Sequence, residues 1–291
     1  GLDRATILRV LREGILEPVG RLATASNATL LCRVRLAPDG PGDPAADPLE
    51  GTCVHKPVRG EAPLWDFPDG TLSAREVAAF ALSEATGWEL VPPTVLREGP
   101  WGPGMAQLWI DVDDEVDVVE LLRSDDPVLF VESQALYATR GHVPDDPDLV
   151  VPLGVARVAR EGTDATIVAW GPAVPVLRPI ALFDAVVNNA DRKAGHLLPV
   201  EPGRILGVDH GVCFHVEPHL RTVLWGWMDQ PLTGPELERL RALRRLLDGE
   251  LGRTLSGLLA PDEVTATVRR VEGLLEKELF TEGQTVAVGD L

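Results

Sequence analysis

The chain has 291 residues, of which 45% are apolar and 25% charged, and a formal net charge of −18. This length is sufficient for one large domain or for two lobes. The excess of acids argues against nucleic acid as a main partner and against binding to anionic membrane surfaces. No apolar run approaches the ~18 residues of a membrane-spanning helix, so we expect no stable membrane insertion.

The three cysteines stand among apolar neighbours in strand-like segments, at positions Cys32, Cys53 and Cys213. None of them is part of a Cys-x-x-Cys pair or of a Cys/His spacing typical of zinc ligands. We therefore expect three reduced core thiols, no structural zinc and a cytoplasmic location.

The first 110 residues alternate between helical and extended patterns. Apolar spacing predicts a helix at 3–13, and a strand–turn–strand pattern over 15–36 has its turn at 21–29. A Pro/Gly/Asp-rich loop at 38–48 precedes a strand at 52–56 and a second loop at 57–72. Further strands are expected at 94–97 and 105–110.

The segment Ser73-Ala74-Arg75-Glu76 has the spacing of a capping box, which satisfies the free N–H groups at a helix start. It predicts a helix running to about Thr86 and closed by Gly87. The N-terminal part is therefore expected to hold five short strands and one internal helix.

The remaining residues, 111–291, form a second unit that is mainly helical. Pro179 suits the first position of an apolar helix over 180–188, because its missing N–H is not needed there. Other patterns predict helices near 115–122 and 131–139, a strand pair at 196–200 and 204–209, and helices at 235–248 and 261–280.

Only three lysines occur in the chain, and two of them have a distinctive setting. Lys56 ends an apolar strand, and Lys193 follows Asp191 by two residues. His196 comes next, and Asp209-His210-Gly211 begins thirteen residues after it, behind an apolar run. An early lysine, then Asp-x-Lys-x-x-ligand, then Asp-x-Gly is the order that phosphoryl transfer on a kinase-like scaffold requires.

These motifs resemble the catalytic and metal-binding loops of phosphatidylinositol 3-/4-kinase-like and HipA-like kinases. Over most of residues 15–230 the chain resembles an actinobacterial family labelled phosphatidylinositol 3-/4-kinase-like, with no assigned substrate. The resemblance implies an α+β, protein-kinase-like bilobal fold. Residues 1–110 would be a nucleotide-binding lobe with a small antiparallel sheet, and residues 111–291 a mainly helical catalytic lobe.

By the same resemblance, Asp191 would orient and deprotonate the acceptor hydroxyl, and Lys193 would neutralise the transferred phosphoryl group. Asp209 would hold the metal bound to ATP. His196 stands where such kinases usually carry a metal-binding Asn. Imidazole is an unusual ligand for Mg²⁺ but binds Mn²⁺ well, so either ion is open.

The nucleotide would be bound by the N-terminal lobe. Lys56 would hold the α- and β-phosphates and pair with Glu76, although Glu76 is also needed by the capping box and Glu84 is the reserve partner. The 21–29 turn would cover the phosphates, and the segment between the lobes would meet the adenine. The nucleotide-binding residues are then Ser26, Asn27, Thr29, Lys56, Glu76, Gln107, Leu108 and Trp109.

We therefore expect a kinase that transfers the γ-phosphate of ATP to a hydroxyl group with a divalent metal. The acceptor is open between a protein Ser/Thr and a small alcohol, and a lipid is the weakest of the candidates. A nucleotide-binding pseudokinase with a regulatory role is the main alternative, and transfer of AMP is a third. The oligomeric state is left open.

Overall fold

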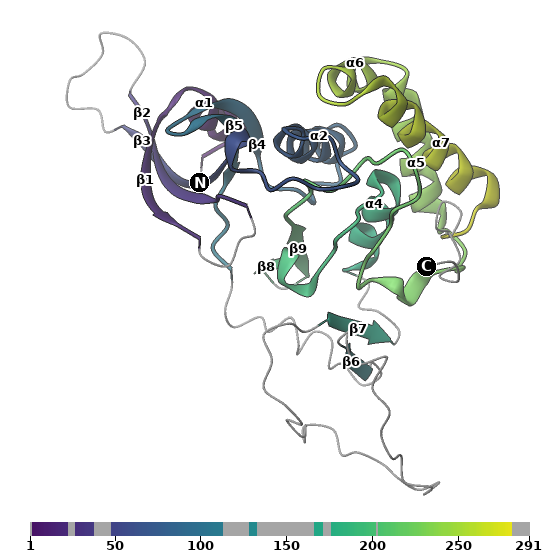
Figure 1. The fold of residues 1–291 in the computed structure, drawn as a ribbon. Coiled ribbons are helices and arrows are strands. Elements are labelled where there is room, and N and C mark those ends of the chain that lie inside the picture. Colours follow the sequence, from purple (N-terminus) through teal and green to yellow (C-terminus); the bar gives the residue numbers. More distant parts are fainter. Residues whose placement is uncertain are drawn as a thin grey trace, which may run out of the picture.

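A computed structural model describes residues 2–22, 27–37, 48–112, 128–132, 166–170, 176–201 and 203–280. Its first part is an antiparallel five-stranded sheet in the order β1-β2-β3-β5-β4, accompanied by helices α1 and α2 (Figure 1). The elements are α1 (Arg4–Glu13), β1 (Ile15–Arg21), β2 (Leu30–Leu36), β3 (Leu49–Pro57), the short 3-10 helix η1 (Val58–Gly60), α2 (Leu72–Ala85), β4 (Thr94–Gly99) and β5 (Gly102–Leu108).

The second part is mainly helical and carries two small two-stranded antiparallel sheets, β6-β7 and β8-β9. Its elements are β6 (Val128–Glu132), β7 (Thr166–Trp170), α4 (Arg178–Val187), η3 (Ala194–His196), β8 (Leu197–Glu201), β9 (Arg204–Gly207), η4 (Trp225–Trp227), α5 (Gly234–Leu247), α6 (Glu250–Ser256) and α7 (Pro261–Lys277). The α+β architecture with two lobes is thus confirmed.

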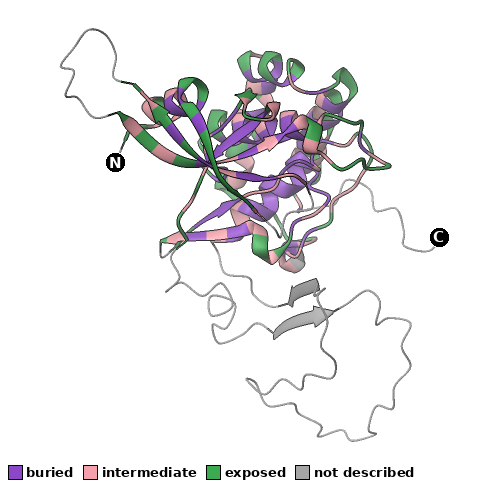
Figure 2. Cartoon of the chain, turned by 60° about the vertical axis from the view of Figure 1, so that its left-hand side comes forward, coloured by how far each residue is buried: buried purple, intermediate pink, exposed green. Residues whose placement is uncertain are grey.

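Helix α2 lies between the two parts and packs on the helical one (Figure 1). Its Ala78, Phe80 and Leu82 belong to the large core built with α4, α5, α6 and α7. A smaller core fills the space between the sheet and α1, around Leu11, Val34 and other apolar side chains. Buried positions are concentrated in these two interiors (Figure 2).

The predicted capping box at the start of α2 is wrong. The helix begins at Leu72, one residue earlier, and Ser73 lies within its first turn. A more distant carboxylate, Glu61, accepts hydrogen bonds from the N–H groups of Leu72 (3.2 Å) and Ser73 (2.8 Å). Because Glu61 satisfies these donors, the carboxylate of Glu76 is not needed to cap the helix.

Other differences concern element ends and one missed helix. Helix α6 was not predicted, and the helix expected at 261–280 ends at Lys277. In α4, Pro179 is the second residue, and Asn188 ends the helix in the left-handed region with φ 54°. The helix expected near 115–122 and the loop at 38–47 lie outside the described residues, and the helix near 131–139 overlaps strand β6 at 131–132.

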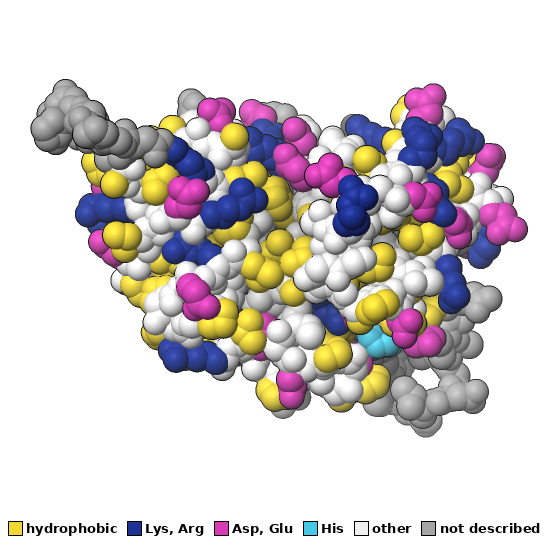
Figure 3. Space-filling view, turned by 90° about the horizontal axis from the view of Figure 1, so that it is seen from above, with side chains coloured by type: hydrophobic (Ala, Val, Ile, Leu, Met, Phe, Trp, Pro, Cys, Tyr) yellow, Lys and Arg dark blue, Asp and Glu magenta, His cyan; other side chains and the backbone are white. Residues whose placement is uncertain are grey.

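The surface carries charges of both signs, and basic and acidic side chains are interspersed on the face drawn in Figure 3. Within the described ranges, every helix is too short or too polar to cross a bilayer.

Candidate active site

Lys56 lies at the centre of the predicted site. Its Nζ is 2.6 Å from Glu76 Oε1 and 2.9 Å from Asp209 Oδ1, so one ammonium joins β3, α2 and the segment after β9. Burial by itself lowers the pKa of Lys56, but the two carboxylates outweigh burial and raise that pKa above its ordinary value. The expected pairing with Glu76 is formed, whereas the reserve partner Glu84 pairs with Arg4.

Glu76 also holds the segment that carries Asp209. Its second oxygen, Oε2, accepts a hydrogen bond of 2.9 Å from the backbone N–H of His210. The residue is 1% exposed, so both carboxylate oxygens are used inside the protein. Glu76 therefore fixes the relative positions of Lys56 and the Asp209 backbone.

In the turn Asp209-His210-Gly211 the unusual backbone conformation is that of Asp209, which has a positive φ of 62°, and not that of Gly211. Asp tolerates this region better than most residues. Its side chain is 47% exposed. Burial raises the pKa of the Asp209 carboxyl, but Lys56 and then His196 outweigh this and hold it well below its usual range.

The segment at 188–196, called the catalytic segment below after its predicted role, places Asp191 and Lys193 together at the surface. Lys193 Nζ is 2.7 Å from Asp191 Oδ2, with side-chain exposures of 64% and 43%. The backbone N–H of Asp191 donates to Asn189 Oδ1 at 3.0 Å, which fixes the turn before it. Both side chains are accessible to a substrate.

A fully buried network supports this segment, and the sequence analysis did not single it out. Arg192 donates to both oxygens of Asp184 at 2.8 and 2.9 Å, and both side chains are 0% exposed. Arg192 also donates to the carbonyl of Val208 at 2.9 Å and to His210 Nε2 at 2.7 Å. The guanidinium thereby joins α4, the catalytic segment and the Asp209 segment.

The state of His210 follows from this contact. Arg192 can only donate, so Nε2 of His210 accepts and the neutral ring carries its proton on Nδ1. Burial, and then the charge of Arg192, lower the pKa of His210 well below its ordinary value. The ring packs edge-on against Phe183 with centroids 5.6 Å apart, so His210 attaches the Asp209 segment to α4.

A second buried ion pair ties α2 to α7. Arg75, 1% exposed, donates to Glu263 Oε1 at 2.5 Å and to the carbonyl of Cys213 at 2.6 Å, and its guanidinium lies 4.8 Å from the Phe67 ring centroid. The sequence signal for this contact is Arg75 itself, the one basic residue of a helix that also carries Glu76 and Glu84. A buried charge of this kind requires a partner inside the protein.

Asp209 and His196 form the donor pair that could hold a metal. His196 Nε2 is 3.3 Å from Asp209 Oδ2. Burial lowers the pKa of His196, which favours the neutral imidazole that a metal requires. In the part of the chain that the structure describes, no group of three or more His, Cys, Asp or Glu side chains could surround an ion. A metal at this pair would have to take its other ligands from phosphate and water.

The phosphate-covering turn is described only in part. Ser26 lies outside the described residues. Asn27 Oδ1 accepts from the N–H of Ala62 at 2.8 Å, and Thr29 Oγ1 donates to the carbonyl of Asn27 at 3.3 Å. These contacts hold the end of the turn against the loop after β3.

The three residues expected to meet the adenine lie at the end of β5. Gln107 is buried and its amide donates to Thr94 Oγ1 at 2.9 Å. The N–H groups of Leu108 and Trp109 already donate to the carbonyls of Pro93 (2.9 Å) and Thr52 (3.0 Å). Trp109 is 36% exposed and leaves an aromatic face accessible.

One cavity of about 160 Å³ brings five of the twelve predicted site residues together. Lys56, Glu76, Asp191 and Asp209 line it, together with Asn27 from the covering turn. Gln107, Leu108, Trp109, Thr29, Lys193 and His196 do not line this cavity. Lys56, the three acids and the end of the covering turn thus meet at one cavity.

Comparison with known proteins identifies one relative that covers nearly the whole chain. Protein Rv2133c of Mycobacterium tuberculosis is 41% identical over 273 residues, covering 93% of this chain and 89% of that protein. A shorter stretch is 48% identical over 59 residues to the pyruvate dehydrogenase E1 component subunit beta of Leifsonia xyli, covering 20% of this chain and 17% of that protein. No protein-family model matches the chain.

Among solved structures, the crystal structure of the Golgi casein kinase with Mn/ADP bound has a TM-score of 0.52 at 14% identity. It covers 97% of this chain and 77% of that one. A second Golgi casein kinase structure has a TM-score of 0.50 at 15% identity, covering 99% and 78%. The fold is therefore protein-kinase-like, and the chain belongs to the same family as Protein Rv2133c.

Proposed function

We propose that this protein is an ATP-dependent phosphotransferase of the phosphatidylinositol 3-/4-kinase-like and HipA-like type. It transfers the γ-phosphate to a hydroxyl group of a protein Ser/Thr or a small alcohol. One observation carries the proposal. Lys56 bridges Glu76 at 2.6 Å and Asp209 at 2.9 Å, and all three line a cavity with Asp191.

The chain's own residues supply the binding and proton-transfer groups of the reaction. Lys56 binds the α- and β-phosphates, and Glu76 keeps its ammonium in place. Asp191 orients the acceptor hydroxyl and takes its proton. The acceptor oxygen forms a bond to the γ-phosphorus, the bond from that phosphorus to the β–γ bridging oxygen breaks, and ADP leaves. Lys193, held beside Asp191, neutralises the charge of the transferred group.

Asp209 and His196 are the residues that would hold a divalent ion. When bound, Mg²⁺ or Mn²⁺ neutralises charge on the β- and γ-phosphate oxygens. The Golgi casein kinase structure was determined with Mn/ADP bound. The imidazole of His196 favours Mn²⁺ here, because Mg²⁺ prefers oxygen ligands.

The wider assignments follow from the same arrangement. Residues 1–110 form the nucleotide-binding lobe and residues 111–291 the catalytic lobe in this proposal. All three cysteines are free and buried, which supports the expected reducing, cytoplasmic location.

The test is a calorimetric titration of ATP into the protein with Mg²⁺ or Mn²⁺. The Asp209→Ala variant is measured alongside, with Asp262→Ala as a control at an exposed acid on α7. Metal-dependent binding that is lost only in Asp209→Ala supports the site. No binding with either metal overturns the proposal.

ATP labelled at the γ- or the α-phosphate then distinguishes phosphate transfer from AMP transfer. Transfer of label from the γ-phosphate supports a kinase, and transfer from the α-phosphate indicates AMP transfer. Binding of ATP without transfer of phosphate to any acceptor favours the pseudokinase alternative. The observation behind this alternative is that His196 stands where such kinases usually carry a metal-binding Asn.

A further inference from the structure

The loop between β3 and α2, residues 58–71, lies against the catalytic segment. Phe67 packs with Leu72, Ala190 and Val212, and Ala190 directly precedes Asp191. Two contacts hold the loop in place. The N–H of Ala62 donates to Asn27, and the carboxylate of Glu61 accepts hydrogen bonds from the first turn of α2, where the loop ends. This loop, called the β3–α2 loop below, therefore has a fixed position beside the proposed catalytic acid.

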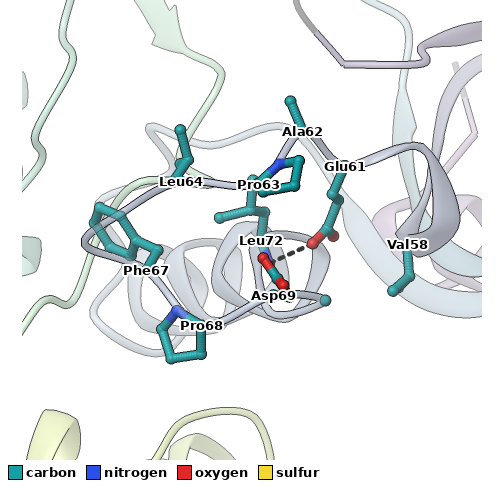
Figure 4. A pocket seen from close by; sticks show the side chains of 10 residues that line it. Val58, Glu61, Ala62, Pro63, Leu64, Phe67, Pro68, Asp69 and Leu72 are labelled. Atoms are coloured by element: carbon teal, nitrogen blue, oxygen red, sulfur yellow. Dashed lines mark hydrogen bonds between the residues drawn. The ribbon is translucent and has the colours of Figure 1, made fainter.

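The β3–α2 loop encloses a pocket of about 350 Å³, lined only by residues between Val58 and Leu72 (Figure 4). Leu64 and Phe67 lie at one end of the pocket and Val58 at the other (Figure 4). Four of its lining residues also line the cavity that contains Lys56 and Asp191, namely Glu61, Ala62, Leu64 and Leu72. The pocket therefore adjoins the proposed phosphate-transfer site.

The chemistry of the pocket is apolar with a negative charge. Its apolar lining includes Leu64, Phe67 and Pro68, and its only charged lining residues within the described chain are Glu61 and Asp69. Leu64, a lining residue, is 37% exposed, and its chain neighbour Trp65, which does not line the pocket, is 89% exposed, so two large apolar side chains are accessible to water beside it. Exposed Trp is common where a protein partner binds, because it buries a large area with little loss of entropy.

We propose that the β3–α2 loop binds the acceptor, and that the acceptor is a Ser/Thr-containing peptide segment with a bulky apolar residue and a basic residue beside the hydroxyl. This inference rests on the proposed function. The apolar residue occupies the pocket and packs on Trp65, while the basic residue lies near Asp69. The hydroxyl then reaches Asp191, which takes its proton as the oxygen bonds to the γ-phosphorus and ADP leaves.

A peptide fits better than a small alcohol for two reasons. An extended segment with its hydroxyl at Asp191 also fills the adjoining 350 Å³ pocket, whereas a small alcohol at Asp191 leaves that pocket vacant. Asp69, in a pocket with no basic lining residue among the described residues, also complements a cation.

The test uses the full chain, γ-labelled ATP and short peptides with a single Ser. A peptide with Leu and Arg near the Ser is compared with matched peptides in which Leu becomes Ala or Arg becomes Glu. Inositol is included as a small-alcohol probe. We expect the Leu/Arg peptide to be preferred by at least about tenfold in kcat/KM over each of the others, as loss of a central apolar or charged contact predicts.

Variants of the loop then locate the effect. Trp65→Ala should raise KM for the peptide about tenfold, with kcat and KM for ATP nearly unchanged, and Trp65→Phe should recover most of the loss. Ile15→Ala, at a 70% exposed position on β1, is the matched control. Asp69→Lys should weaken the preference for Arg.

The outcomes separate this inference from the proposed function. Absence of metal-dependent ATP binding in the unaltered protein overturns the proposed function and the inference with it. Efficient transfer to inositol, or transfer to peptides that Trp65→Ala and Asp69→Lys leave unchanged, overturns the inference alone and leaves a phosphotransferase with a different acceptor site.

Discussion

Two ion pairs within one short stretch of chain differ sharply in their surroundings. Asp184 and Arg192 are both 0% exposed, and the guanidinium is bonded to the carboxylate, a backbone carbonyl and an imidazole. Asp191 and Lys193, on either side of Arg192, are 43% and 64% exposed and bonded to one another. Adjacent residues thus belong to two environments, one closed to water and one open.

The two environments indicate two roles, a structural one for the buried pair and a chemical one for the exposed pair. A buried charge loses its hydration and must be compensated inside the protein, so removing one partner leaves a large penalty. An exposed pair gains little because water competes for both charges. We infer that the buried pairs hold the loops in place, while the open acids and lysines are free to bind phosphate and acceptor.

Asp184→Ala should have the largest effect on stability. It leaves the buried Arg192 without a counter-charge, and such a loss typically costs about 3–5 kcal/mol. Urea denaturation followed by fluorescence measures it, with Asp262→Ala as an exposed control. A loss below about 1 kcal/mol would show that water reaches Arg192 and that the two environments are not distinct.

Glu263→Gln tests the second buried pair. Arg75 keeps the Cys213 carbonyl and the Phe67 ring, so we expect a smaller loss of about 2–3 kcal/mol. The double variant with Arg75→Met should lose less than the sum of the two single losses. Additive losses would show that the two side chains do not interact in solution.

Asp209→Ala should change stability by no more than about 1 kcal/mol, because its side chain is 47% exposed and Lys56 retains Glu76. The same variant should lose metal-dependent ATP binding. Parallel denaturation and calorimetry measure both effects. If Asp209→Ala is unfolded, the role of Asp209 is structural instead.

Asp191→Ala should leave stability almost unchanged, within about 0.5 kcal/mol, since the pair with Lys193 is exposed. ATP binding should persist while phosphate transfer falls by about 10²–10⁴-fold, the range of general acid–base catalysis. Transfer at the original rate would remove Asp191 from the reaction.

His196→Asn should have the smallest effect on the fold and a specific effect on the metal. An amide oxygen in place of the imidazole should move the preference from Mn²⁺ towards Mg²⁺. Calorimetry with each ion, at fixed ATP, measures the ratio of affinities. An unchanged ratio would argue against His196 as a ligand.

The sequence alone determined most elements and the members of the central cluster. Alternation of apolar residues places β2 correctly, with Leu30, Cys32 and Val34 buried on one face. A lysine in an apolar strand requires a carboxylate, and Glu76 lies on the next helix, so the Lys56–Glu76 pair was predictable. These features depend on near neighbours or on residue types with few alternatives.

Tertiary structure decided which groups are partners across the chain. Glu61 replaced the local capping box, and the positive φ fell on Asp209 instead of Gly211. Arg75 found Glu263, a residue 188 positions away, and Arg192 bonded to Asp184 and His210. A charged side chain can pair with any opposite charge that the fold brings close, so packing and desolvation decide which partner it has. Local sequence patterns contain information on neither packing nor desolvation.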